Sequence, residues 1–176
     1  MIGQIELVVG PMFSGKSTEL LRRMRRLEVA KKKCLYIKYK QDTRYSKDCI
    51  ATHNNETRKA APCDKLTEID NLEDFECIGV DEGQFFPDLI EFCEKAANKG
   101  KLVIVAALDG TFERKPFGQI CELIPLCESV TKLRAICMEC QAEASFSKKI
   151  SKDNKNLIDI GGSDKYISVC RECYNK

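Results

Sequence analysis

A phosphate-binding motif at residues 10–17 constrains the fold of this chain more than any other feature. These residues read Gly-Pro-Met-Phe-Ser-Gly-Lys-Ser and match the pattern G-x-x-x-x-G-K-S/T. Such a loop must follow a strand and open a helix. Both neighbours are predicted, because residues 5–9 are β-branched and leucine-rich, and Leu20, Met24 and Leu27 recur at helical spacing. A glycine turn without a ligand is the alternative, but the full motif in this context favours phosphate binding.

The loop is expected to supply charge as well as shape. A helix that begins at the loop directs its unpaired N–H groups and its positive dipole end toward a bound phosphate. Lys16 then adds a positive charge at the outer phosphates, and Ser17 adds a hydroxyl ligand for Mg²⁺.

Composition narrows the class of protein. The 176 residues suit one compact domain with a small appendage, and a hydrophobic content of 43% is enough for a core. A net charge of +2 gives no general nucleic-acid footprint, no apolar run is long enough for a membrane span, and the N-terminus lacks a secretory signal layout. The odd count of 11 cysteines favours reduced thiols and a metal site over disulfides. We expect a soluble cytoplasmic protein without membrane or nucleic-acid partners.

The rest of the first 130 residues predicts alternating strands and helices. Strands are expected at residues 34–38, 77–81 and 102–108, and a helix at 88–97 that stops near Gly100. This order indicates an α/β fold with a parallel sheet flanked by helices. Residues 39–74 are polar and poorly periodic and are expected to form an irregular excursion. It contains His53, with a structural role as its default, and Arg44, which is either an exposed charge or a phosphate contact.

Two carboxylates, Asp81 and Glu82, follow the predicted strand at 77–81. An aspartate at a strand tip after a phosphate-binding loop is the usual ligand of Mg²⁺. Glu82 is a candidate general base if the phosphoryl acceptor is an alcohol. Ligands of parallel sheets bind at the carboxyl ends of the strands, which are residues 10 onward, 81–82 and 109–112.

A doubled C-x₂-C pattern marks the last part of the chain. Cys137, Cys140, Cys170 and Cys173 suit a tetrahedral structural zinc site. A zinc ion at this point would close the base of the loop 141–169, whose tip holds Gly161, Gly162 and then Tyr166. The pattern leaves two interpretations equally open, a substrate lid or an ordinary hairpin.

These motifs favour phosphoryl transfer or nucleotide hydrolysis without naming the acceptor. One alternative is an ATPase acting on nucleic acid, with Arg22, Arg23, Arg25 and Arg26 as its phosphate-binding patch. Another is a nucleotide-binding zinc module without catalysis, which the pair of acids at 81–82 argues against.

The chain resembles the type II thymidine kinases, the cellular cytosolic and poxviral family, over nearly its whole length. The resemblance is carried by residues 10–20, 81–87, 106–112, 114–117 and 160–162 and by the two C-x₂-C pairs. It implies transfer of the γ-phosphate of ATP to the 5′-hydroxyl of thymidine. It also implies a RecA-like domain at 1–130, a zinc-binding lasso or lid domain at 131–176, a homotetramer, and feedback inhibition by dTTP.

The resemblance assigns roles to individual residues. Glu82 is the general base, and Ser17 and Asp81 serve Mg²⁺. The ATP site comprises Gly10, Pro11, Met12, Phe13, Ser14, Gly15, Lys16, Ser17, Asp42, Arg44, Asp81 and Gln84. The thymidine site comprises Met12, Phe85, Leu108, Phe112, Phe117, Leu157, Ile158, Asp159, Ile160, Gly161 and Tyr166. Cys137, Cys140, Cys170 and Cys173 hold structural zinc.

Two departures from the family pattern stand out. Asp159 occupies a position that is usually aliphatic, so it faces solvent if the thymine base is read by backbone atoms. The sequence stops at Lys176 without the regulatory tail of cellular relatives, so tail-dependent degradation is not expected.

Overall fold

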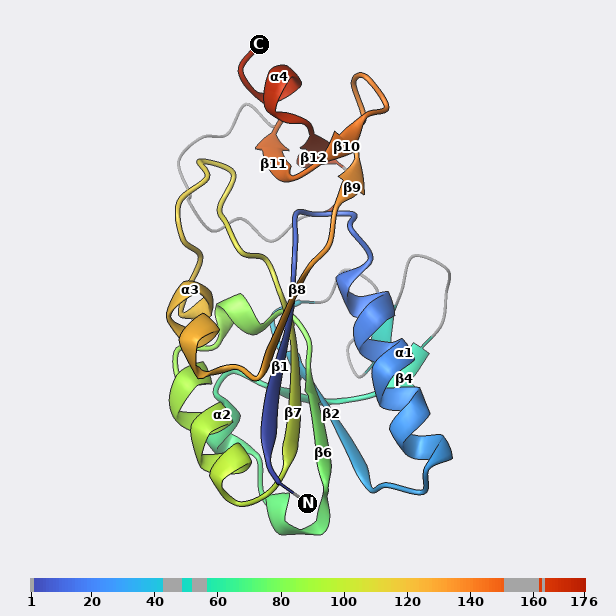
Figure 1. The fold of residues 1–176 in the computed structure, drawn as a ribbon, viewed down its shortest axis with the longest axis vertical. Coiled ribbons are helices and arrows are strands. Elements are labelled where there is room, and N and C mark those ends of the chain that lie inside the picture. The colour runs from blue at the N-terminus through green and yellow to red at the C-terminus, as the bar shows by residue number, and fades with distance from the viewer. Residues whose placement is uncertain (1, 43–48, 52–56, 151–161, 163) are drawn as a thin grey trace.

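A six-stranded parallel sheet forms the centre of the molecule (Figure 1). The computed structural model describes residues 2–42, 49–51, 57–150, 162 and 164–176. In spatial order the strands are β5 (Ala61–Cys63), β2 (Cys34–Tyr39), β6 (Cys77–Val80), β7 (Leu102–Ala107), β1 (Gln4–Val9) and β8 (Ser129–Lys132). The predicted α/β class and parallel sheet are confirmed.

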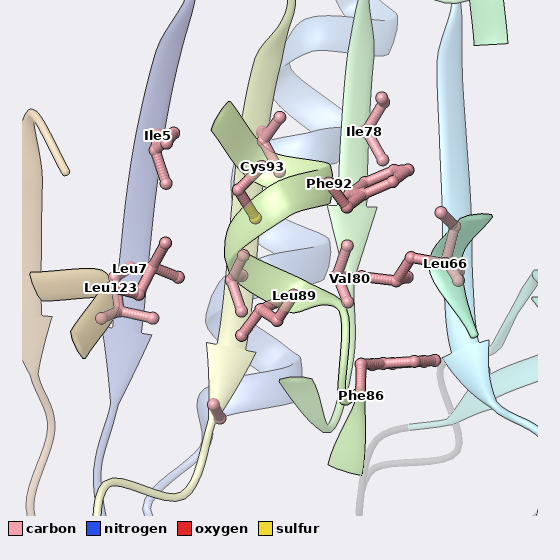
Figure 2. Packing of buried hydrophobic residues seen from close by; sticks show 14 of the residues in the cluster. Ile5, Leu7, Leu66, Ile78, Val80, Phe86, Leu89, Phe92, Cys93 and Leu123 are labelled. Carbon is pink, nitrogen blue, oxygen red and sulfur yellow. The ribbon is translucent and has the colours of Figure 1, made fainter. Parts of the chain in front are cut away.

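Helices cover both faces of this sheet (Figure 1). Helix α1 (Lys16–Val29) packs its buried Leu20, Leu21 and Met24 on one face. Helices α2 (Leu89–Asn98) and α3 (Ile120–Leu123) pack on the other face, together with the single turns η1 (Leu66–Glu68), η2 (Leu72–Asp74), η3 (Gly83–Phe85) and η4 (Ile124–Leu126). Because side chains alternate along a strand, one strand contributes to the buried clusters on both faces. Leu7 belongs to the cluster under α2, which Figure 2 shows, and Val8 belongs to the cluster under α1.

The sheet contains two edge strands that the sequence pattern does not reveal. β5 lies within residues 39–74, so the expectation of an irregular excursion is wrong there. The strand has three residues and carries Pro62, which an edge strand tolerates but which hides the strand pattern. β8, at the other edge, is mostly exposed and therefore lacks a clear apolar alternation. A further short pair, β3 (Cys49–Ala51) and β4 (Thr57–Lys59), is antiparallel and lies outside the main sheet.

A separate small unit follows β8, beyond the carboxyl ends of the central strands (Figure 1). We call its described residues from 135 to 176 the cysteine unit. It contains the strand pair β9 (Ala135–Ile136) and β10 (Glu143–Ala144), the pair β11 (Phe146–Lys149) and β12 (Tyr166–Val169), and the short helix α4 (Arg171–Tyr174). Its buried cluster is distinct from those of the sheet. The domain boundary at residue 130 stays a prediction, and β8 keeps its place in the sheet as far as Lys132.

None of the helices in the described part of the chain combines the length and apolar character needed to cross a membrane.

Candidate active site

The phosphate-binding loop connects β1 to α1 as the motif predicts. Gly15 begins the helix with φ 80°, a left-handed conformation that favours glycine although a Cβ there would meet nothing within 4 Å. Gly10 is required for a different reason, since a Cβ on it would lie 2.7 Å from the carbonyl oxygen of Leu133. Gly15 thus permits the backbone conformation at the end of the loop, and Gly10 permits close packing against Leu133 at its start.

Side chains of the loop converge on one carbonyl oxygen. Lys16 Nζ and Ser14 Oγ each donate a hydrogen bond to the carbonyl oxygen of Pro11 at 2.8 Å. The ammonium group is therefore folded back over the loop, where a bound phosphate would accept from it.

Ser17 and Asp81 meet across the gap between α1 and the end of β6. Ser17 Oγ lies 2.9 and 3.1 Å from the two carboxylate oxygens of Asp81. Burial raises the pKa of Asp81 to about 7, helped by the charges of Glu82 and Asp42 and opposed by the Ser17 hydroxyl and Lys16. Asp42, itself buried, thus lies near this carboxylate. Hard oxygen ligands with excess negative charge fit Mg²⁺, whose charge would favour the ionised form of Asp81.

Glu82 stands just past the end of β6 in a strained backbone conformation. Its φ of 55° and ψ of 42° are left-handed, which is uncommon for a residue other than glycine. The chain turns here into η3, with Gly83 packed so closely that a Cβ would lie 2.5 Å from a methyl of Val105. Glu82 therefore turns with the following loop and does not continue the strand.

Gln84 connects this turn to the next strand. Its Nε2 donates to Glu82 Oε2 at 2.6 Å, and its Oε1 accepts from the backbone N–H of Leu108 at 3.0 Å. The predicted site residues at the ends of β6 and β7 are thereby linked through one side chain.

Aromatic rings gather at the same edge of the sheet. Phe85 stacks on Tyr39 with ring centres 5.0 Å apart and meets Phe117 edge-on at 5.6 Å. Phe112 and Tyr166 lie 6.4 Å apart, so the cysteine unit contributes one ring of this second pair. Four residues of the predicted thymidine site thus form two aromatic pairs, and Tyr39 joins them without having been predicted.

Two hydrogen bonds join the cysteine unit to the loops of the candidate site. Met12 N–H donates to Ser147 Oγ at 3.0 Å, and Tyr174 Oη donates to the carbonyl oxygen of Phe112 at 2.6 Å. The sequence gives no signal for either contact, because a lone serine and a lone tyrosine near the cysteines fit many roles.

A cavity of about 210 Å³ also lies where the two regions meet. Its lining includes Thr111, Arg114, Lys132 and Ser147. Of the described residues assigned individually to the ATP or thymidine site, Pro11 alone lines it, next to residues 109–111 at the end of β7. We therefore locate the candidate site by the converging loop, carboxylates and rings, and not by this cavity.

The four paired cysteines form one cluster. The sulfur atoms of Cys137, Cys140, Cys170 and Cys173 all lie within 4.8 Å of one another, and the Cys140 and Cys170 sulfurs are 3.6 Å apart. Four thiolates around zinc at about 2.3 Å would be separated by about 3.8 Å. The donor set and its spacing fit a structural zinc ion, as the sequence predicts.

Other predicted residues lie outside the described part of the chain. These are Arg44, Leu157, Ile158, Asp159, Ile160 and Gly161, and also His53. The base of the 141–169 loop is an antiparallel hairpin formed by β11 and β12. The lid hypothesis concerns its tip and stays a prediction.

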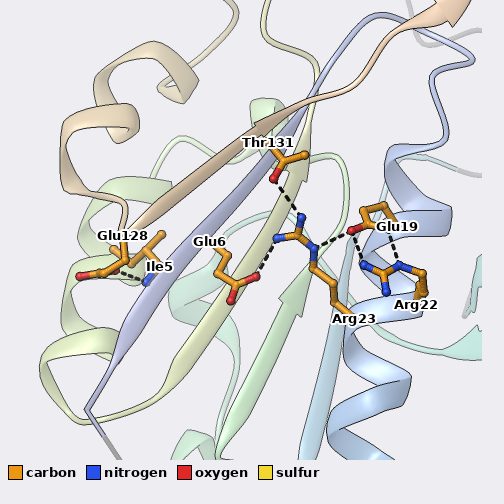
Figure 3. Close-up of polar contacts among 7 residues, drawn as sticks. All are labelled: Ile5, Glu6, Glu19, Arg22, Arg23, Glu128 and Thr131. Atoms are coloured by element: carbon orange, nitrogen blue, oxygen red, sulfur yellow. Dashed lines mark hydrogen bonds and ion pairs between the residues drawn. The ribbon is translucent and has the colours of Figure 1, made fainter.

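Two of the four arginines of α1, Arg22 and Arg23, have partners within the protein (Figure 3). Arg23 contacts Glu19 at 2.8 Å, Glu6 at 2.7 Å and Thr131 at 3.0 Å, while Arg22 pairs with Glu19 at 2.6 Å. Arg23 thereby ties α1 to β1 and β8. These contacts argue against a nucleic-acid patch built on Arg22 and Arg23.

Comparisons with known proteins agree on one family. A family model described as "Thymidine kinase" matches residues 3–174. The thymidine kinase of Myxoma virus (strain Lausanne) is 56% identical over 173 residues, which cover 98% of this chain and 96% of the viral protein. The cytosolic thymidine kinase of Bos taurus is 58% identical over 175 residues, covering 99% of this chain and 73% of the bovine protein. That of Homo sapiens is 57% identical over 175 residues, covering 99% and 74%.

Proposed function

The chain belongs to the thymidine kinase family, and from this premise we propose that it transfers the γ-phosphate of ATP to the 5′-hydroxyl of thymidine. The observation that carries the proposal is the meeting of Ser17 and Asp81, with Glu82 as the next residue, beside the phosphate-binding loop. A cation-binding pair next to a carboxylate at a strand end is what phosphoryl transfer to an alcohol requires.

The donor side of the site is proposed to be the loop and its neighbours. Backbone N–H groups of residues 10–17 and the Lys16 ammonium would bind the phosphates of ATP. Ser17 and Asp81 would hold Mg²⁺, which when bound neutralises charge on the outer phosphates. Asp42, Arg44 and Gln84 complete the proposed donor set.

The acceptor side is proposed to lie among the aromatic rings. Phe85, Phe112, Phe117 and Tyr166, with Met12 and Leu108, would enclose the nucleoside, and residues 157–161 would contact the base through backbone groups. Enclosure excludes water, which would otherwise accept the phosphoryl group. Glu82 would take the proton from the 5′-hydroxyl as the new P–O bond forms, while the bond between the γ-phosphorus and the β,γ-bridging oxygen breaks and ADP leaves.

The wider properties are proposed from the family. The paired cysteines would hold structural zinc, and the protein would act as a homotetramer inhibited by dTTP. The vertebrate relatives named as cytosolic support a cytoplasmic location for this chain.

The test compares ATP consumption with Mg²⁺ and either thymidine, deoxycytidine, deoxyguanosine or single-stranded DNA. We expect turnover with thymidine, with its 5′-monophosphate as product. Glu82→Gln should lower kcat by about 100-fold or more, because the general base is lost while the shape is kept. The exposed Glu91→Gln on α2 is the control and should leave kcat unchanged. Turnover stimulated by DNA and indifferent to thymidine would overturn the kinase assignment.

A further inference from the structure

Glu82 needs an external constraint if its carboxylate is to act in one orientation. It lies two positions beyond Val80, the last residue of β6, so no strand pairing fixes its backbone, and its left-handed φ of 55° is held by the surrounding turn. A general base must meet the hydroxyl proton within about 0.5 Å of the productive position. The rest of the site must therefore hold the carboxylate as well as the backbone.

The Gln84 side chain makes this contact, and its amide can be oriented in only one way. One end faces the backbone N–H of Leu108 at 3.0 Å, and a backbone N–H can only donate, so that end must be the carbonyl oxygen. The other end is then the NH₂ group, which donates to Glu82 Oε2 at 2.6 Å. The hydrogen bond from Leu108 thus ensures that Gln84 presents its NH₂ group, and not its carbonyl oxygen, to the Glu82 carboxylate.

The surroundings of Gln84 prevent it from moving away. Its exposed fraction is 4%. Gly118, with φ 54°, packs against its main chain so tightly that a Cβ would lie 2.3 Å from the Gln84 carbonyl oxygen. Gly83 packs against β7 in the same way. A glutamine amide that is buried, packed and bonded at both ends is a rigid support for the group it contacts.

We propose that Gln84 is a positioning residue for the reaction. Its side chain holds the Glu82 carboxylate through Oε2 and is itself fixed by the backbone N–H of Leu108, at the end of β7. The inference rests on the proposed function and changes the role given to Gln84, from a contact with ATP to a contact with the base. One prediction separates the two roles. A residue that acts through Glu82 affects kcat and leaves ATP binding unchanged, whereas a residue that contacts ATP affects the binding of ATP.

Two variants remove different parts of the contact. Gln84→Met keeps the volume and removes both hydrogen bonds. Gln84→Glu keeps an acceptor for Leu108 but replaces the donor to Glu82 with a second carboxylate. Each should lower kcat about 10- to 100-fold, the effect of a hydrogen bond to a charged group. Gln84→Met, which adds no charge, should also keep KM for ATP within about 2-fold of wild type. Gln119→Met is the matched control, because Gln119 Oε1 also accepts a backbone N–H, that of Ile90 at 3.0 Å, outside the site.

The decisive experiment is the double variant Glu82→Gln/Gln84→Met, measured for kcat and for ATP affinity by calorimetry. If Gln84 acts through Glu82, the second substitution costs nothing further once the base is gone. Losses in kcat that are independent and multiply in the double variant, or weaker ATP binding in Gln84→Met, would overturn the inference while leaving the kinase assignment in place. If Glu82→Gln alone retains wild-type kcat, the proposal that Glu82 is the general base is refuted, and the inference about Gln84 is refuted with it. Thermal unfolding of each variant identifies losses that come from misfolding.

Discussion

The sheet region and the cysteine unit lie against each other but are stabilised by different means. The sheet carries a buried apolar cluster on each face. All its central strands contribute side chains to both clusters, α1 contributes to one and α2 to the other. The described part of the cysteine unit has a single cluster of five buried residues, and two of these are the candidate zinc ligands Cys137 and Cys173. The sheet can therefore fold on hydrophobic burial, whereas the cysteine unit lacks the apolar area to do so.

This difference indicates where a metal contributes to folding and where it contributes to chemistry. A zinc ion in the cysteine unit would replace a missing core, since small units below the size of a stable core usually need a metal or disulfides. A cation beside Asp81 would have no such role, because the strands around it are already packed. Removal of the metal is therefore expected to destabilise the fold at the cysteine site and to leave it largely unchanged at the Asp81 site.

The largest effect is expected from loss of zinc. Structural zinc contributes on the order of 10 kcal/mol, so Cys137→Ser should release zinc and expose residues 141–169 to protease. Hydrogen exchange of β1 and β7 should stay slow. Cys121→Ser, which changes an exposed cysteine outside the cluster, is the control. Equal protease resistance with and without metal would contradict the structural-zinc account.

An intermediate effect is expected where the two regions touch. Tyr174→Phe removes the hydrogen bond to the Phe112 carbonyl and should cost about 1 kcal/mol. Because Phe112 belongs to the proposed thymidine site, KM for thymidine should rise several-fold while KM for ATP stays the same. Tyr36→Phe is matched to it, since Tyr36 Oη donates to Glu28 at 2.8 Å on the α1 face of the sheet. If both variants change KM for thymidine equally, the contact between the regions has no special role.

The smallest effect is expected from a polar contact within the sheet region. Hydrogen bonds from Arg22, and also from Arg23, hold the pKa of Glu19 at about 2 against its usual 4.5, despite partial burial. Its stabilising contribution is therefore complete above about pH 4.5 and lost as the pH falls toward 2. Glu19→Gln should be less stable than wild type by roughly 0.5 kcal/mol at pH 7 and nearly equal to it near pH 2. Urea unfolding at both pH values measures this, and a difference that persists at low pH would refute it.

The sequence predicts what short motifs of fixed residue type and spacing encode, including a motif that is repeated further along the chain. The phosphate-binding loop, the carboxylates at 81–82 and the doubled C-x₂-C pattern each combine residue type with spacing, and the structure brings the members of each together. The central strands are also readable because they are apolar throughout. A local pattern is enough to predict a feature when the residues that define it lie in one motif or one strand.

The remaining contacts depend on partners far apart in the chain. Gln84 meets Leu108 only because β6 and β7 are neighbours in the sheet, and Ser147 meets Met12 across 135 positions. Edge strands β5 and β8 are too short or too exposed to show periodicity. Such features depend on the order of the strands in the sheet, which cannot be predicted from a local sequence pattern.

The join between the two regions also limits how the length of the chain can vary. Only two residues, 133 and 134, separate the end of β8 from the start of β9. Leu133 N–H donates to the carbonyl oxygen of Val9 at 2.8 Å, and its own carbonyl lies against Gly10. One inserted or deleted residue would move this carbonyl off the first glycine of the loop. Substitutions can accumulate here over evolution or in a design library, but insertions and deletions cannot.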